Sequence, residues 1–129
     1  MGAVFWIAVG GALGSVSRYG LSMLVDQRIK AEFPWGTMVC NVLGSFLIGL
    51  LAHWLVVDRH GWLPVPVRQG ILVGVLGGFT TFSSFSLQTL ALIREDGWPA
   101  ALLNIGLSLV LCLLSVWAGA TAGSALLDD

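Results

Sequence analysis

The chain has 129 residues, of which 57% are hydrophobic and only 10% charged, and its mean hydropathy is +0.90. A soluble domain carries about 25% charged residues, so this composition excludes a water-soluble globule. It also excludes a disordered chain, which needs low hydrophobicity and high charge. The six basic residues form no cluster, which excludes a nucleic-acid-binding surface. We expect one lipid-solvated domain covering residues 1–129.

Four uncharged stretches divide the chain, and they cover residues 1–17, 33–57, 69–93 and 97–127. A transmembrane helix needs about 20 predominantly apolar residues. We therefore predict an all-α, multi-pass membrane protein with four transmembrane helices, near residues 3–25, 36–57, 67–93 and 98–123.

The first span contains Arg18, which lies close enough to the end of the helix for its head group to reach the interface. No positive region precedes the apolar run and no convincing cleavage site follows it. We therefore predict a retained first helix and not a signal peptide.

The connections between spans, at 26–35, 58–67 and 94–98, are too short to hold a soluble domain, so function must lie in the bundle. The middle connection carries turn and breaker residues, namely His60, Gly61, Pro64 and Pro66. Tryptophans near the predicted helix ends are expected at the membrane interface; they are Trp35, Trp62 and Trp98.

Basic residues are nearly balanced between the two sides of the predicted bundle. One side carries Arg28, Lys30 and Arg94, with Arg18 if it extends that way; the other carries Arg59 and Arg68. This weak bias leaves two interpretations open. Either the richer side lies inside in a fixed orientation, or the chain inserts both ways and an antiparallel homodimer forms.

Glycines recur at the spacing that lets helix backbones approach closely in lipid. The sets are Gly10 and Gly14; Gly70, Gly74 and Gly78; and Gly119 and Gly123. Helix packing explains most of them. Because lipid alone would fill these grooves in an isolated monomer, we infer oligomerisation.

The third span contains poor helix sequence at bilayer depth, because Gly77-Gly78 is followed by the β-branched Thr80 and Thr81. We predict a break near Gly77–Thr80. Lipid cannot satisfy freed backbone groups, so the break must be buried in protein or line a cavity. Carbonyls facing one point would suit a cation, and amides and hydroxyls an anion. The alternative is a kinked helix whose hydroxyls bond to the preceding turn.

Neutral polar residues dominate the other spans. Asn41 lies in the second, and one face of the fourth carries Asn104, Ser108, Cys112 and Ser115. Plain interhelical hydrogen bonding is the alternative role for this face. Cys40 and Cys112 sit in apolar runs and indicate no disulfide and no metal site. Between the helix ends there is no Asp, Glu or Lys, which argues against a proton-coupled pump.

Phe82 and Phe85 are three residues apart and share a helix face. Ordinary packing is the common role of such a pair. Their positive ring edges can also attract a small anion. With neutral donors nearby, the pattern favours a small, strongly hydrated anion whose water shell is replaced by hydrogen bonds.

Three stretches of the sequence resemble the Fluc (CrcB-like) fluoride channels. Residues 77–85, GGFTTFSSF, resemble the family's third-helix signature G-G-hydrophobic-T-T-F-S-T-F. Residues 10–19 resemble its first-helix pattern, and residues 35–44 resemble its G-T-x-x-x-N stretch. The resemblance covers nearly the whole chain.

The resemblance implies an antiparallel, dual-topology homodimer with two fluoride pores in the bacterial inner membrane, and no enzyme activity. It implies that Phe82 and Phe85 are pore phenylalanines and Asn41 a pore donor. Backbone carbonyls of Gly77 and Thr80 would hold a structural sodium ion at the dimer centre. Further pore hydroxyl, thiol and vestibule positions would be Ser83, Ser84, Ser108, Cys112 and Arg18.

The sequence departs from the family pattern at three positions: Ser84 replaces the commoner Thr, Gln88 stands where Glu is frequent, and Cys112 replaces a hydroxyl with a weaker thiol donor. Two other functional classes compete. A small multidrug-type transporter would share four short helices and dual topology, but it uses a first-helix Glu that is missing here. A non-transporting assembly or lytic protein would need no broken helix.

Overall fold

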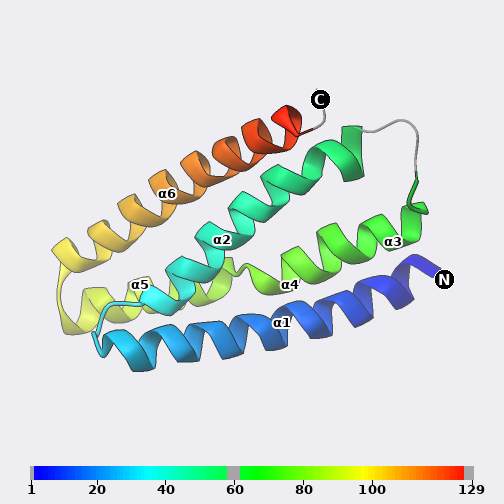
Figure 1. The fold of residues 1–129 in the computed structure, drawn as a ribbon. Helices are drawn as coiled ribbons and strands as arrows, with labels where there is room; N and C mark the ends of the chain where they lie inside the picture. Colours follow the sequence, from blue (N-terminus) through cyan, green and yellow to red (C-terminus); the bar gives the residue numbers. More distant parts are fainter. Residues whose placement is uncertain (1, 58–61, 127–129) are drawn as a thin grey trace.

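A computed structural model describes residues 2–57 and 62–126, and the regular secondary structure in this part of the chain is entirely helical (Figure 1). The elements are α1 (Gly2–Ile29), α2 (Trp35–Ala52), the π-helical η1 (His53–Val57), α3 (Val65–Gln69), the π-helical η2 (Gly70–Leu76), α4 (Gly77–Phe79), α5 (Phe82–Glu95) and α6 (Trp98–Ala125). The predicted all-α class is confirmed for the described residues.

These elements form four rods, as predicted. The first runs to Ile29, beyond the expected end at residue 25, and α2 with η1 covers the second expected span. The third rod contains α3, η2, α4 and α5, and α6 is the fourth. Of the predicted middle connection, residues 58–61, including His60 and Gly61, lie outside the described residues.

Three of the four rods are long and apolar enough to cross a membrane. Their bounds and mean hydropathies are Trp35–Val56 with 1.9, Val65–Glu95 with 1.5 and Trp98–Ala125 with 2.2. α1 has 28 residues, which is ample length, but Arg18 and its glycines and serines lower its hydropathy.

Helix ends are set by local features that hold the rods in register. The carboxylate Oδ1 of Asp26 accepts a hydrogen bond of 2.8 Å from the N–H of Gly36, which satisfies a free donor at the start of α2. Gly97 has φ of +88°, a left-handed conformation that suits glycine and turns the chain sharply from α5 into α6. Trp35 and Trp98 are the first residues of α2 and α6, as expected for interfacial anchors.

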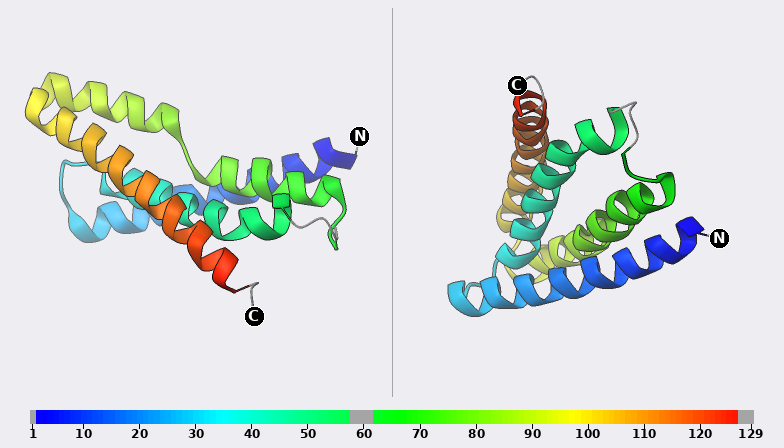
Figure 2. Two further views of the ribbon diagram at one scale, coloured as in Figure 1. Left: turned by 90° about the horizontal axis from the view of Figure 1, so that it is seen from above. Right: turned by 45° about the vertical axis from the view of Figure 1, so that its right-hand side comes forward.

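The rods pack as two close pairs, visible in Figure 2. α1 lies along α3, η2 and α4, and α2 lies along α6. A Cβ on Gly14 would collide with the carbonyl oxygen of Val75, and one on Gly119 with that of Phe46. Glycine therefore brings backbone against backbone in both pairs.

This arrangement corrects the inference drawn from the glycines. Their grooves are filled by helices of the same chain and not by lipid: Gly78 faces the backbone of Gly11, and Gly123 faces that of Leu50. These glycines are packing residues, as the simpler interpretation held. They therefore give no reason of their own to expect a second copy.

Candidate functional site

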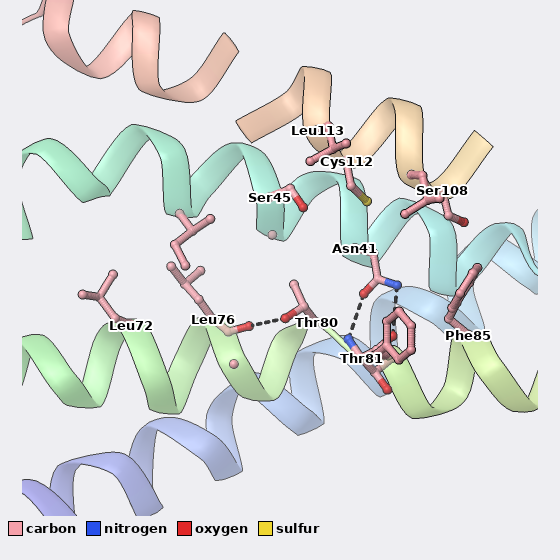
Figure 3. Close-up of a pocket in the computed structure, with 15 residues that line it drawn as sticks. Asn41, Ser45, Leu72, Leu76, Thr80, Thr81, Phe85, Ser108, Cys112 and Leu113 are labelled. Atoms are coloured by element: carbon pink, nitrogen blue, oxygen red, sulfur yellow. Dashed lines mark hydrogen bonds between the residues drawn. The ribbon is translucent and has the colours of Figure 1, made fainter. Parts of the chain in front are cut away.

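A cavity of about 370 Å³ lies where the third rod meets α2 and α6 (Figure 3). It collects seven of the residues singled out from the sequence: Asn41, Gly77, Thr80, Phe82, Phe85, Ser108 and Cys112. Among the described residues that line it, no side chain is charged. The cavity is thus a neutral site with amide, hydroxyl, thiol and aromatic walls.

The third rod is interrupted beside this cavity, as predicted, but the interruption lies at the threonines and not at the glycines. Gly77 is helical, with φ of −66° and ψ of −35°. Thr80 and Thr81 are extended, with ψ of 153° and 121°. The hydroxyl of Thr80 donates to the carbonyl of Leu76 at 3.0 Å, so back-bonding to the preceding turn occurs together with the break.

Thr81 begins the second half of the rod. Its Oγ1 accepts a hydrogen bond of 3.2 Å from the N–H of Ser84, and it thereby caps α5. The same oxygen lies 3.3 Å from the Oγ of Ser83. The threonine pair is therefore well suited to end one helix and start the next.

Asn41 bridges to the broken backbone from α2. Its Oδ1 accepts from the N–H of Thr81 at 2.8 Å, and its Nδ2 donates to the carbonyl of Thr81 at 3.1 Å (Figure 3). In a continuous helix the Thr81 N–H would bond to the carbonyl of Gly77. One carboxamide thus satisfies two backbone groups that lipid could not, and it retains a second N–H.

Arg18 supports the break from the opposite side. Its Nε donates to the carbonyl oxygen of Gly78 at 3.1 Å, although the two residues are 60 positions apart in the chain. In a continuous helix this carbonyl would accept from Phe82. The sequence suggested that the head group extends to the interface, whereas here it is half-buried and bonded to the third rod.

The two phenylalanines contact each other at the start of α5. Their ring centroids are 5.3 Å apart and the planes are inclined by 51°. Phe82 is 76% exposed, whereas Phe85 is half-buried in the cavity wall. An exposed aromatic ring at a cavity mouth can present its edge to an approaching anion.

The polar residues of α6 have two different roles: two line the cavity and two bond to neighbouring helices. Ser108 and Cys112 line the cavity. Asn104 donates to Thr89 Oγ1 at 2.9 Å, and Ser115 donates to the carbonyl of Val42 at 2.9 Å. Interhelical hydrogen bonding, the simpler interpretation, is therefore correct for these last two residues.

Other sequence candidates lie outside the cavity lining. Ser83 and Ser84 follow Phe82 on α5 but are not among the residues that line it. Gln88 borders a separate cavity of about 260 Å³, together with acidic residues of the α1–α2 connection and α5. The buried Oε1 of Gln88 has no partner among the described residues.

Two polar residues of the site did not emerge from the sequence. Ser45 lines the cavity one helical turn after Asn41. Its i+4 spacing from Asn41 was the available signal. Thr81 was identified only as a weak helix former, and its capping role could not be separated from that of Thr80.

The chain is similar to known proteins over most of its length. Residues 5–120 match the family model described as "CrcB-like protein, Camphor Resistance (CrcB)". Three similar relatives are named "Fluoride-specific ion channel FluC". One, from Opitutus terrae, is 52% identical over 119 residues, covering 92% of this chain and 90% of that protein. One from Paramagnetospirillum magneticum is 49% identical over 118 residues, covering 92% of each. One from Rhodospirillum rubrum is 48% identical over 126 residues, covering 96% and 95%.

The family match covers most of the chain, and the relatives match over nearly their full lengths. The match extends from α1 into α6 and includes the broken rod and every wall of the cavity. The chain therefore belongs to the CrcB-like family and is an integral, multi-pass protein of the bacterial inner membrane.

Proposed function

We propose that this chain forms a fluoride-selective channel that lets fluoride leave the cell passively and carries out no catalysis. The observation that carries the proposal is the composition of the cavity wall. It combines the amide of Asn41, the hydroxyl of Ser108 and the rings of Phe82 and Phe85, with no charged lining residue among those described. The names of the relatives support the same ion.

The chemistry of the wall matches the problem of conducting fluoride. Fluoride is small and holds water tightly, so donors must replace its hydration at each step without binding it too strongly. Neutral amide and hydroxyl donors meet this balance, whereas a fixed positive charge at bilayer depth is costly and would retain the anion. The second N–H of Asn41, the Ser108 hydroxyl, the weaker Cys112 thiol and the phenylalanine ring edges are the groups that we assign to the path.

We further propose that Ser83 and Ser84 continue the path beyond Phe82. Ser83 is exposed and directly follows Phe82 in the chain, which supports a place at the outer end of the path. Arg18 is assigned to the vestibule in this proposal, and the bond from its Nε to the Gly78 carbonyl also supports the break.

An antiparallel homodimer with two such paths is part of the proposal. Its support is the open surface at the break. Phe82 is 76% exposed. A Cβ on Gly77 would meet nothing nearer than the Leu72 carbonyl oxygen at 3.8 Å. A close-packing partner could occupy this surface, and the nearly balanced basic residues would permit it to insert in the opposite sense.

The break also fits a structural sodium ion. Because the Thr81 N–H donates to Asn41, the Gly77 carbonyl loses its ordinary helical donor, and Thr80 is extended beside it. Hard cations favour such oxygen ligands. We propose that the carbonyls of Gly77 and Thr80, supplied by both copies, hold sodium at the dimer centre. The ion would cross-link the two broken helices and neutralise carbonyl dipoles there.

The competing multidrug-type transporter finds less support. Its class relies on a membrane-embedded Glu in the first helix, and the acidic residue of α1 is Asp26, which caps α2 near the membrane boundary. The cavity would offer an organic cation no carboxylate among its described lining residues.

Anion release from liposomes tests the proposal directly. Purified protein is reconstituted in vesicles loaded with potassium fluoride, and release is followed with a fluoride electrode after a potassium ionophore is added. We expect rapid fluoride release, and retention of chloride in matched chloride vesicles. Equal release of both halides, or release of neither, would contradict a fluoride-selective channel.

A further inference from the structure

A buried hydrogen-bonded link joins α5 to α6 outside the cavity. Asn104 is 1% exposed and Thr89 is 8% exposed. The Nδ2 of Asn104 donates to Thr89 Oγ1 at 2.9 Å, and Thr89 Oγ1 donates to the carbonyl of Phe85 at 2.7 Å. A hydroxyl has one hydrogen, which is used on Phe85, so the direction of the whole chain of bonds is fixed.

The link lies one helical turn from the cavity on both helices. Thr89 is four residues after Phe85, and Asn104 is four residues before Ser108. Residues spaced by four lie one above the other on a helix face. The bond between Thr89 and Asn104 therefore joins the same faces that carry Phe85 and Ser108 into the cavity wall.

α5 has few other means of holding its position. The extended Thr80 and Thr81 interrupt the helical hydrogen bonds that would fix α5 to α4. Within the described chain α6 is the principal neighbour of α5, and α2 touches it only slightly. The position of Phe85 relative to Ser108 therefore depends on how α5 is held against α6.

We propose that Asn104 and Thr89 are positioning residues that set the distance between Phe85 and the Ser108–Cys112 wall. This inference rests on the proposed function, because its consequence is the passage of fluoride beside Phe85. Breaking the link leaves both helices intact but lets α5 shift. The substitution should therefore change the fluoride concentration that gives half-maximal flux, and not only the stability of the protein.

Flux measurements on four variants test this role. Thr89→Val keeps the side-chain shape and removes the hydroxyl, whereas Thr89→Ser keeps the hydroxyl. Asn104→Leu removes the other partner, and the double variant T89V/N104L completes the cycle. Thr121→Val is the matched control, since the exposed Thr121 hydroxyl donates to the carbonyl of Trp117 at 2.9 Å without joining two helices.

We expect Thr89→Val and Asn104→Leu each to change the fluoride concentration for half-maximal flux about threefold to tenfold, with the double variant no worse than either. Thr89→Ser and Thr121→Val should match the parent. The proposal would be overturned if the changes in this concentration add up in the double variant. It would also be overturned if Thr89→Ser shows the same change as Thr89→Val.

A second measurement does not depend on fluoride. Cys112 lines the cavity, whereas Cys40 is 0% exposed and serves as an unreactive reference. A small, neutral thiol reagent should label Cys112 at a different rate in Thr89→Val than in the parent, Thr89→Ser and Thr121→Val. If the parent passes no fluoride, the proposed function fails and the labelling rates still decide the positioning role. Equal labelling rates in all these proteins would reject that role.

Discussion

A single carboxamide supports the interrupted backbone of the third rod. The family resemblance implied that Asn41 is a pore donor. The structure shows that its oxygen and one of its N–H groups are bonded to Thr81. These bonds are non-local, 40 residues apart in the chain, so no spacing rule could predict them. The predictable part was that a neutral amide at bilayer depth requires a partner.

Asn41→Leu should consequently destabilise the protein and also lower its fluoride flux. Each buried backbone group left without a partner costs about 1–3 kcal/mol, and Asn41 serves two. We expect a clear fall in the unfolding midpoint measured in detergent, together with lower fluoride flux. Leu43→Ala, at a 40% exposed position of the same helix, should leave both nearly unchanged. A stable Asn41→Leu protein would show that the two bonds contribute little.

Substitution of the phenylalanines separates conduction from folding. Phe82→Ile and Phe85→Ile keep much of the side-chain volume but remove the ring edges. Since Phe82 is 76% exposed, its replacement should not disturb packing within the chain. We expect each variant to assemble normally and to lose about tenfold or more of its fluoride flux, equivalent to about 1.4 kcal/mol in the barrier. Leu126→Ala, also at an exposed position, is the control, and parental flux in both phenylalanine variants would place the path elsewhere.

The broken third rod shows what local sequence can predict about an element. Its existence followed from glycine and β-branched residues at bilayer depth, and the four rods followed from uncharged length. The exact place of the break did not follow, because the glycine pair does not form the break itself. Gly78 stays helical and lies against the backbone of Gly11 and Ser15 of α1, while capping by Thr81 starts the new helix. The π-helical turns of η1 and η2 also left no recognisable pattern.

Two glycines of α1 make a matched pair for testing helix packing. A Cβ on Gly14 would collide with the Val75 carbonyl and lie 2.9 Å from the N–H nitrogen of Phe79, whereas one on Gly11 would meet nothing within 4 Å. Gly14→Ala should therefore push α1 away from the third rod and cost about 1–3 kcal/mol of stability. Gly11→Ala should be neutral or more stable by up to about 1 kcal/mol, since alanine is the better helix former. Unfolding midpoints in detergent measure both, and equal values would refute the interlocked pair.

At the scale of the whole molecule, α1 begins and α6 ends at one end of the bundle, and the α1–α2 connection lies at the other (Figure 1). The four rods therefore place Arg28, Lys30 and Arg94 at the same end of the bundle, as the sequence predicted. Which rods pair could not be predicted, because small-residue spacing shows that a helix can pack closely but does not identify its partner. The glycine patterns consequently suggested a second copy where the structure has a second helix.

Charge balance makes the orientation of the molecule testable. A reporter fused to the C-terminus should be active on both sides of the membrane if the chain inserts both ways. Gln27→Lys with Ala31→Lys, at exposed positions, adds two charges to the richer side and should drive nearly all copies into one orientation. Fluoride flux should then fall, and co-expression of a copy biased the opposite way should restore it. The paired serine substitutions are the control, and a one-sided reporter signal in the parent would exclude the antiparallel dimer.

The pairing of first rod with third, and second with fourth, also sets an order of events during synthesis. Arg18 lies 60 residues before the carbonyl that accepts its hydrogen bond. At about 5–20 residues per second, the ribosome needs about 3–12 s to supply that partner. Throughout this interval Arg18 lacks its Gly78 carbonyl partner, and the glycines of α1 lack the backbone of the third rod. The partner of α2 is made later still, because α6 begins only at Trp98, so the pair of α1 with the third rod can form before the pair of α2 with α6.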